Sequence, residues 1–164
     1  MNDPTPRADE DIEQIVRQHA ATVYKLAFAQ TRNRSDAEDI MQEVFLRYIR
    51  RLPDFESEEH AKAWFLRVTC NCLKNYWNAP FRKNTEELVD DIPCEDPEEL
   101  GMQELMRQLP KDFRVILHLF YYEDMSTAQI SRLTGRKEST VRVYLTRARR
   151  QLKEILEGGD NRVG

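Results

Sequence analysis

The stretch DMSTAQISRLTGRKESTVRVYLTRARRQLKEIL, residues 124–156, decides the fold of the C-terminal half of the chain. It predicts two short amphipathic helices separated by a turn at Gly135, and Ser126 with Gln129 fits the S-x-x-Q capping box that opens a helix. In the second helix, apolar residues line one side and basic residues cover the other. This combination predicts a helix-turn-helix, a motif whose second helix enters the DNA major groove.

The second helix has an inward stripe with spacings of 4, 3, 4 and 3, at Val141, Leu145, Ala148, Leu152 and Ile155. Because each residue turns the helix by about 100°, the other side faces outward. Early residues of a recognition helix meet base edges, and later ones tend to meet phosphates. Arginine suits guanine and valine suits the thymine methyl. The predicted DNA contacts are Ser139, Arg142, Val143 and Thr146 to bases, with Thr140 beside them, and Arg147, Arg149, Arg150 and Lys153 to phosphates.

The charge of the chain is unevenly placed. There are 25 Lys+Arg against 29 Asp+Glu, a net charge of −4, which is unusual for a protein that binds DNA unaided, because phosphate contacts supply much of the affinity. Residues 132–153 hold eight basic groups and a single acid, Glu138, whereas residues 84–99 hold eight acids and no base. An isolated basic helix face would be read as a solvated surface. Here it coincides with the capping box and the turn, so we infer DNA binding in which another component supplies part of the affinity.

The N-terminal half contains three further predicted helices, and few glycines or alternating runs occur anywhere, so the chain is predicted to be all-α. Trp64 and Phe65 are predicted to lie largely inward in the third helix. The first helix is expected from Asp11 to a break around residues 31–34. The second is expected to begin at Ser35, in an S-x-x-E capping box with Glu38, and to end at Pro53. The third is expected from Ala61 to Asn78, with Ser57 as a candidate N-cap.

Residues 81–97, FRKNTEELVDDIPCEDP, are acidic, contain two prolines and lack an apolar stripe. We therefore place a domain boundary in this segment and expect two small helical domains joined by a flexible acidic linker. The expected organisation is a disordered N-terminus at 1–10, a helical domain at 11–80, the linker at 81–97, a helix-turn-helix domain at 98–157 and a disordered tail at 158–164.

The three cysteines, Cys70, Cys72 and Cys94, accompany a polar N-terminus without an apolar signal segment. No run approaches the roughly 18 apolar residues that span a bilayer, so a cytoplasmic protein with reduced thiols and no membrane insertion is predicted. A metal site at Cys70 and Cys72 is disfavoured, because helical residues two apart point roughly 160° apart. Catalytic carboxylate pairs, metal motifs and phosphate-binding glycine loops are not found. Neither an enzyme, a cofactor nor a metal is therefore expected.

Four motifs, in order, resemble those of bacterial RNA polymerase sigma factors of the sigma-70 family, and more narrowly the extracytoplasmic-function (ECF) group. The resemblance covers about residues 11–157. The motifs are DAEDIMQEVF at 36–45, AWFLRVTCN at 63–71, Leu109–Tyr122 leading into Met125 and Ser126, and Val141-Arg142 followed by Leu145–Arg149.

This resemblance implies an alternative sigma factor, which binds core RNA polymerase at the β′ clamp helices and the β flap and directs it to promoter DNA. The C-terminal helix-turn-helix would read the −35 element. An anti-sigma factor, often membrane-bound, commonly holds members of this group inactive. The implied polymerase-binding residues are Asp36, Asp39, Gln42, Glu43 and Phe45, although Asp36 and Glu38 also suit a helix N-terminus.

The resemblance further implies that the loop from Phe55 to His60 captures a base flipped out of the −10 element, at a stacking cost of a few kcal/mol that a pocket recovers. The third helix would line the melted strand. The implied −10 residues are Phe55, Ser57, His60, Arg67, Asn71, Lys74, Asn75 and Tyr76.

Two points stay open in the sequence. Arg136 and Lys137 stand where relatives often have an apolar residue and a small hydroxyl, so the recognition helix could start a turn later, with Ser139 as its cap. Tyr144 stands where another basic residue is common, which leaves the −35 preference open. The alternative function is a stand-alone helix-turn-helix transcriptional regulator, which would leave the motifs at 36–45 and 63–71 unexplained.

Overall fold

The computed structural model describes residues 9–79, 101 and 104–163, with side chains described between residues 10 and 158. The chain divides into two compact units, Met1–Asp90 and Asp91–Gly164. The described part of the chain contains helices and their connections but no strand, which confirms the predicted all-α class. The predicted linker at 81–97, including Cys94, lies outside the described residues.

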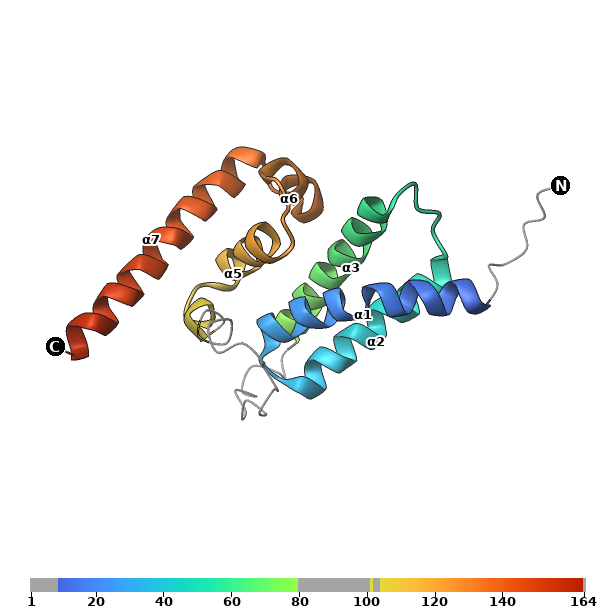
Figure 1. Cartoon of the computed structure of the whole chain (residues 1–164), viewed down its shortest axis with the longest axis horizontal. Helices are drawn as coiled ribbons and strands as arrows, with labels where there is room; N and C mark the ends of the chain where they lie inside the picture. Colours follow the sequence, from blue (N-terminus) through green and yellow to red (C-terminus); the bar gives the residue numbers. More distant parts are fainter. Residues whose placement is uncertain (1–8, 80–100, 102–103, 164) are drawn as a thin grey trace. The chain divides into compact units, whose positions relative to one another are not determined.

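The first unit is a three-helix bundle of α1 (Asp9–Thr31), α2 (Arg34–Arg51) and α3 (Glu58–Asn78). Each helix packs against the other two, and Figure 1 shows α1 and α2 lying side by side while α3 crosses them. The apolar residues that recur at helical spacing meet at the centre of the bundle, where burial removes them from water. The core includes Val23, Leu26, Ala27, Val44, Tyr48, Phe65, Leu66 and Leu73.

The turn between α1 and α2 differs from the sequence prediction, which assigned a capping box to Ser35. The backbone turns at Arg32, which has a positive φ of 54°. Asn33 then adopts an extended conformation, and its side-chain oxygen accepts a hydrogen bond from the Asp36 amide at 3.0 Å. Asn33 is therefore the N-cap, and Ser35 already lies within the helix. The turn at Arg32 decides which polar side chain reaches the unpaired amides of the first turn.

The loop between α2 and α3 follows the prediction closely. Leu52 ends α2 in the left-handed conformation (φ 41°), and its amide bonds to the Tyr48 carbonyl at 2.8 Å. Pro53 follows, where a helix could not continue. The Ser57 side chain accepts a hydrogen bond from the His60 amide at 3.0 Å, which confirms Ser57 as the N-cap. The helix consequently begins at Glu58, three residues before the predicted start at Ala61.

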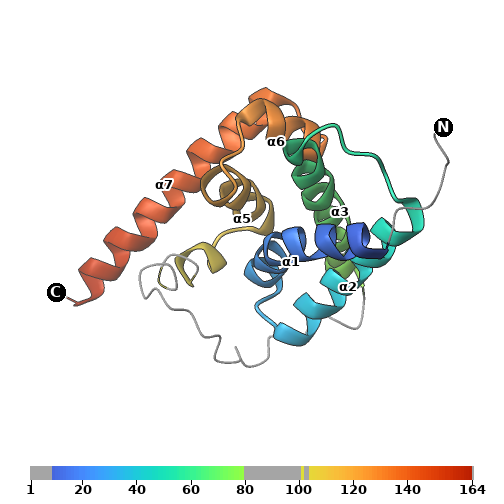
Figure 2. The same cartoon turned by 45° about the vertical axis from the view of Figure 1, so that its right-hand side comes forward.

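The second unit contains α5 (Lys111–Leu117), the π-helical turn η2 (His118–Tyr122), α6 (Thr127–Thr134) and α7 (Glu138–Val163). Both α5 and α6 pack against α7, and α6 also contacts η2; Figure 2 shows α6 near the first turns of α7, with α5 alongside. No local pattern in the sequence predicts the π-helical turn. The core of this unit includes Ile116, Leu117, Leu119, Ile130, Val141, Leu145 and Ala148.

Helix α7 is longer at its C-terminus than the sequence analysis expected. It continues through Val163, whereas residues 158–164 were expected to form a disordered tail. Its last turns extend past α5 and α6 in both views (Figures 1 and 2). Glycine in a helix interior costs only roughly 0.5–1 kcal/mol relative to alanine, so Gly158 and Gly159 weaken the helix without blocking its geometry. At the other end of the chain, α1 begins at Asp9, within the expected disordered segment 1–10.

Candidate nucleic-acid interface

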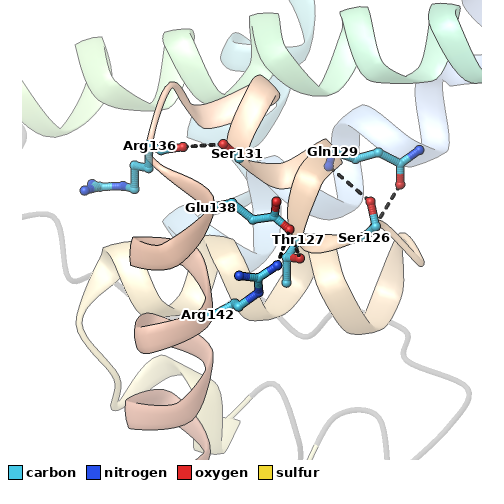
Figure 3. A network of polar contacts seen from close by, with 7 residues as sticks. All are labelled: Ser126, Thr127, Gln129, Ser131, Arg136, Glu138 and Arg142. Carbon is cyan, nitrogen blue, oxygen red and sulfur yellow. Dashed lines mark hydrogen bonds and ion pairs between the residues drawn. The ribbon is translucent and has the colours of Figure 1, made fainter.

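Helices α6 and α7 form the predicted helix-turn-helix, and each end of α6 is fixed by its sequence (Figure 3). The Ser126 hydroxyl accepts from the Gln129 amide at 3.1 Å, while the Gln129 side chain accepts from the Ser126 amide at 2.8 Å. This reciprocal pair is the predicted capping box. Gly135 ends the helix with φ of 76°, a conformation that side chains with a Cβ rarely adopt. The capping box and the turn at Gly135 are both confirmed.

The turn after Gly135 is held by side-chain contacts that no local pattern in the sequence predicts. The Ser131 hydroxyl donates to the Arg136 carbonyl at 2.5 Å. The Arg136 guanidinium pairs with Asp112 of α5 at 3.0 Å and lies 5.1 Å from the centre of the Tyr144 ring. Arg136 and Tyr144 therefore brace the turn and α7 against α5. Since α7 begins at Glu138, Ser139 is inside its first turn and does not cap it.

The outward side of α7 carries most of the residues predicted to contact DNA. Val141, Leu145 and Ala148 are buried against the rest of the unit. Thr140 is half-buried, and Val143 keeps 43% of its surface exposed although it is apolar. The remaining predicted residues are exposed, namely Ser139, Arg142, Thr146, Arg147, Arg149, Arg150 and Lys153. The arrangement gives one helix face that combines arginines with small polar and apolar groups.

Two arginines on this face are restrained by neighbouring side chains. The Nη2 atom of Arg142 lies 2.8 Å from the Oε2 atom of Glu138. The Nε atom of Arg149 donates to the Tyr121 hydroxyl at 2.6 Å, and its guanidinium lies 5.3 Å from the centre of the Phe120 ring. Arg149 is thereby held toward the π-helical turn. A π-helical turn was absent from the sequence prediction, so this restraint could not be foreseen.

In the first unit, α3 presents a polar face made of predicted −10 residues. Arg67, Asn71, Lys74 and Asn75 are all exposed, and their spacings of 4, 3 and 1 place them on one side of the helix. Tyr76 does not belong to this face. It is half-buried, and its hydroxyl donates to the Oδ2 atom of Asp36 at 2.8 Å, so it joins α3 to the first turn of α2.

The loop before α3 is organised around Phe55. Its ring is half-buried and lies 6.2 Å from Tyr48, 5.6 Å from His60 and 5.9 Å from Trp64, measured between ring centres. The Nδ1 atom of His60 accepts a hydrogen bond from the Glu56 amide at 3.1 Å. Phe55 and His60, together with the N-cap Ser57, therefore shape the loop. Trp64 is half-buried beside the buried Phe65, close to its predicted inward position.

Helix α2 carries the residues predicted to bind polymerase, and one of them, Phe45, lies on the buried side of the helix. Asp39 and Gln42 are exposed, and Glu43 is half-buried beside Arg47 at 3.2 Å. Phe45 is only 9% exposed and packs 5.4 Å from Phe65. Its assignment to a docking surface is corrected, because it lies on the side of α2 that faces the core.

Two exposed apolar residues on the same helix were missed. Leu46 keeps 42% of its surface exposed and Ile49 keeps 48%. Together with Asp39 and Gln42 they recur at spacings of 3, 4 and 3, which places all four on one helix face; we call this the α2 face. The sequence could have predicted this face, because Leu46 and Ile49 continue the helical spacing of Asp39 and Gln42.

An open cleft runs between the exposed parts of α2 and α3, and it brings both groups of predicted residues together. Its lining includes two predicted polymerase-binding residues and two predicted −10 residues. The lining residues are Asp39, Ile40, Glu43, Arg47, Cys72, Asn75, Tyr76 and Ala79.

Cys70 and Cys72 are both buried and not paired in a disulfide. Burial raises the pKa of the Cys70 thiol to about 12, and burial also raises the pKa of Cys72. Both thiols are therefore protonated at neutral pH, the form that reacts poorly with oxidants and metals. Although they point in different directions from α3, both are covered because the helix packs against α1 and α2. Among the described residues, no group of three or more His, Cys, Asp and Glu side chains could hold a metal.

His19 is a buried titratable group in the first unit, and its ring stacks on Phe65 at 4.6 Å between ring centres. Burial lowers the pKa of His19 below its ordinary value of 6.5, opposed by Glu58 and assisted by Lys62. A neutral imidazole fits this aromatic setting. Its role is packing in the core.

Comparison with known families places sigma-70 motifs on both units. The model for sigma-70 region 2 matches residues 15–79, and the model for sigma-70 region 4 matches residues 100–152. The first match covers the three-helix bundle, and the second covers α5, η2, α6 and most of α7. In the described part of the chain, no helix is sufficiently long and apolar to cross a bilayer.

Two curated relatives are named as RNA polymerase sigma factors. The ECF RNA polymerase sigma factor SigE of Mycolicibacterium smegmatis is 33% identical over 157 residues, covering 88% of this chain and 61% of that protein. The probable RNA polymerase sigma factor RfaY of Xanthomonas campestris is 32% identical over 155 residues, covering 85% of this chain and 39% of that protein. The chain thus spans less than two thirds of the length of each of these two relatives.

A solved structure shares the fold. The sigma factor RpoE of Bartonella quintana, crystallised with the anti-sigma factor NepR, matches with a TM-score of 0.76 and 19% identity, covering 90% of this chain and 98% of that one.

Proposed function

The chain belongs to the sigma-70 family of RNA polymerase subunits, and from this premise we propose that it is an alternative sigma factor of the ECF type. It binds core RNA polymerase, directs the enzyme to particular promoters and helps to melt the −10 element. The observation that carries this proposal is the helix-turn-helix of α6 and α7, with an exposed arginine-rich face, on the same chain as a bundle that matches region 2.

The −35 element would be read by α7. Its first turns carry Ser139, Arg142, Val143 and Thr146 on the exposed side, where residues of a recognition helix meet base edges. The exposed Val143 suits the methyl group of thymine, and Arg142 suits guanine. Arg147 and Arg150, with the restrained Arg149, would contact phosphates on either side. Because the chain as a whole is acidic, the polymerase would contribute the rest of the non-specific DNA affinity.

The melted −10 strand would follow the polar face of α3, where arginine, lysine and asparagine side chains can meet backbone phosphates and base edges. These residues are Arg67, Asn71, Lys74 and Asn75. The segment from Phe55 to His60, which ends in the first turn of α3, would receive the flipped base. Phe55 and His60 already contact each other there, so we propose that this aromatic loop forms a wall of the pocket, while Ser57 and Tyr76 serve the fold.

Core polymerase would dock on the α2 face. Leu46 and Ile49 supply exposed apolar area, and Asp39 and Gln42 supply polar contacts beside it. Burying these two side chains against the polymerase would remove apolar surface from water, with the polar groups forming the rim of the contact. Phe45 is excluded from this contact because the core covers it. The region 4 unit would add the contact with the β flap.

An anti-sigma factor is a further proposed partner. A sigma factor of the same fold was crystallised with one, and an inhibitor that covers the α2 face would exclude core polymerase. Because its partners are the polymerase and the chromosome, the protein would act in the cytoplasm. It would have no catalytic residues of its own, since the polymerase performs the chemistry.

The experiment is run-off transcription on a library of genomic fragments, with bacterial core polymerase in the presence and absence of the protein. Discrete start sites that depend on the protein would support the proposal and reveal both promoter elements. An absence of such start sites, combined with DNA binding by the protein alone, would contradict it and favour the stand-alone regulator.

A further inference from the structure

A chain of polar contacts connects the start of α6 to the DNA-reading side of α7 (Figure 3). Ser126 and Gln129 fix the first turn of α6 through the capping box, and Thr127 is the first residue of that helix. The Thr127 hydroxyl donates to the Oε2 atom of Glu138 at 2.7 Å. The same oxygen accepts from the Nη2 atom of Arg142 at 2.8 Å. Arg142 is therefore tied, through Glu138, to a different helix.

This arrangement differs from an ordinary ion pair on a helix surface. Arg17 with Glu13 and Lys153 with Glu157 have the same spacing of four residues, and their acids are 60% and 63% exposed. The Glu138 side chain is only 36% exposed, and its partner on α6 is already anchored. An exposed pair gains little because two mobile side chains must be ordered to form it. At Glu138, the acid has been ordered by the fold before Arg142 approaches.

We propose that Glu138 is a positioning residue that determines specificity at the −35 element, by holding Arg142 in the orientation that reads one guanine. This inference rests on the proposed function. It assigns a role in DNA reading to the single acid among the basic residues of the recognition segment 132–153. An acid in the first turn of α7 favours the helix N-terminus but weakens attraction to DNA phosphates.

The first physical reason is preorganisation. An arginine side chain has several rotatable bonds, and ordering it on binding has an entropic cost. Holding Arg142 in place beforehand lowers that cost for one geometry only. The guanidinium has five N–H donors; the contact with Glu138 engages one nitrogen, which leaves an edge for the bidentate contact to the O6 and N7 atoms of guanine.

The second reason is electrostatic. The carboxylate of Glu138 repels phosphates and offsets the charge of Arg142, so the guanidinium is less attracted to the DNA backbone. A bidentate contact to a base edge distinguishes one base from another, whereas a contact to a phosphate carries no sequence information. Glu138 therefore favours base reading by Arg142 over a sequence-independent contact.

The test uses the full-length protein with core polymerase, transcribing a promoter library in which each −35 position is randomised. For the wild-type protein, guanine at one position is expected to exceed other bases by roughly 5- to 150-fold, the range of one bidentate contact. Arg142→Ala removes this preference. Glu138→Gln is expected to weaken the preference at the same position and at no other, and the double variant should match Arg142→Ala there.

Two further variants separate positioning from folding. Glu157→Gln removes an acid with the same spacing from a base on the same helix, and it should leave every −35 preference unchanged. Thr127→Val keeps the Glu138 carboxylate but removes the hydroxyl that anchors it, so it should weaken the same preference to a smaller extent. If the Glu138→Gln variant does not fold, the guanine preference of the Thr127→Val variant decides whether Glu138 positions Arg142.

The outcomes are distinct. If Glu138→Gln lowers transcription equally on all sequences, or if its effect on preference is independent of Arg142, the role of Glu138 is structural and the inference is overturned. If the wild-type protein produces no promoter-specific start sites, the proposed function fails and the inference fails with it.

Discussion

One hydrogen bond joins a residue predicted to bind polymerase to a residue predicted to line the −10 strand. Asp36 was expected to bind polymerase and Tyr76 to line the melted strand, yet the two are hydrogen-bonded to each other at 2.8 Å. A hydrogen bond to a charged acceptor contributes more than one between neutral groups. Residues 40 positions apart in the sequence offered no local pattern from which this contact could be predicted.

Replacing Tyr76 by Phe is expected to destabilise the first unit by about 1–2 kcal/mol, because the Asp36 carboxylate loses a donor in a half-buried position. The two tryptophans of the chain, Trp64 and Trp77, both lie in this unit, so fluorescence during urea unfolding measures its stability selectively. The control is Tyr24→Phe. Tyr24 is a half-buried tyrosine on α1, stacked on Phe28, and the change should have little effect. Equal effects of the two variants would contradict the assigned role of the hydroxyl.

His19 gives the first unit a predicted dependence on pH. Burial lowers its pKa below 6.5, so between the lowered value and 6.5 the unfolded chain binds a proton that the folded unit does not. The contribution of neutral His19 to the free energy of unfolding is therefore fully present above pH 6.5. This contribution is lost as the pH falls toward the lowered pKa of His19, and no further loss occurs below that pKa. Urea midpoints measured at several pH values should show this loss for the wild-type protein.

The matched variants are His19→Gln, which should lose this part of the pH dependence, and His60→Gln at an exposed position, which should keep it. A wild-type midpoint that stays constant through this pH range would contradict the prediction.

At the scale of elements, the residue at which a helix begins depends on the backbone turn before it, and sequence patterns predict that turn only partly. The S-x-x-E pattern at Ser35 met the requirements of a capping box, but the left-handed turn at Arg32 places Asn33 at the cap position. At Ser57 and Ser126 the serine itself has the extended backbone of a cap residue, and the predictions were confirmed. The difference arises because the turn at Arg32 gives that extended conformation to Asn33, two residues before Ser35.

This correction can be tested with two alanine variants. Asn33→Ala is expected to destabilise the first unit by about 1 kcal/mol, since the Asp36 amide loses its acceptor. Ser35→Ala is exposed and inside the helix, so it should be neutral or slightly stabilising because alanine has the higher helix propensity. The measurement is urea unfolding followed by tryptophan fluorescence. A larger loss for Ser35→Ala would restore the cap to that residue.

At the scale of the whole molecule, the two units divide the proposed work between them. The first offers the α2 face and the polar face of α3, and the second offers the arginine-rich face of α7. Such a division suits a factor whose DNA contacts become effective only on the polymerase. It is also compatible with a net charge of −4, because the basic residues are concentrated on the helix that is proposed to read DNA.

Truncating Leu46 and Ile49 together to alanine is expected to weaken binding to core polymerase by at least roughly 1 kcal/mol, or about fivefold, because each truncation removes apolar area that the interface would bury. Binding can be measured by titrating a labelled full-length protein with core enzyme, and tryptophan fluorescence verifies that the first unit remains folded.

Leu156→Ala is the control, since Leu156 is 50% exposed on α7 of the other unit. Unchanged affinity of the double variant would exclude the α2 face as the docking surface. Phe45→Ala, by contrast, should mainly destabilise the fold, because that ring is buried.

Features that depend on near neighbours along the chain could be predicted from the amino-acid sequence. Helical periodicity, the caps at Ser57 and Ser126, and the left-handed turn at Gly135 all follow from interactions over a few residues, and they were sufficient to predict an all-α chain with a helix-turn-helix. The tertiary structure alone decided which faces are covered. It buried Phe45 and left Leu46 and Ile49 exposed, paired Tyr76 with Asp36, and anchored Glu138 to Thr127. These outcomes depend on how separate helices pack, and packing brings together residues that no local pattern connects.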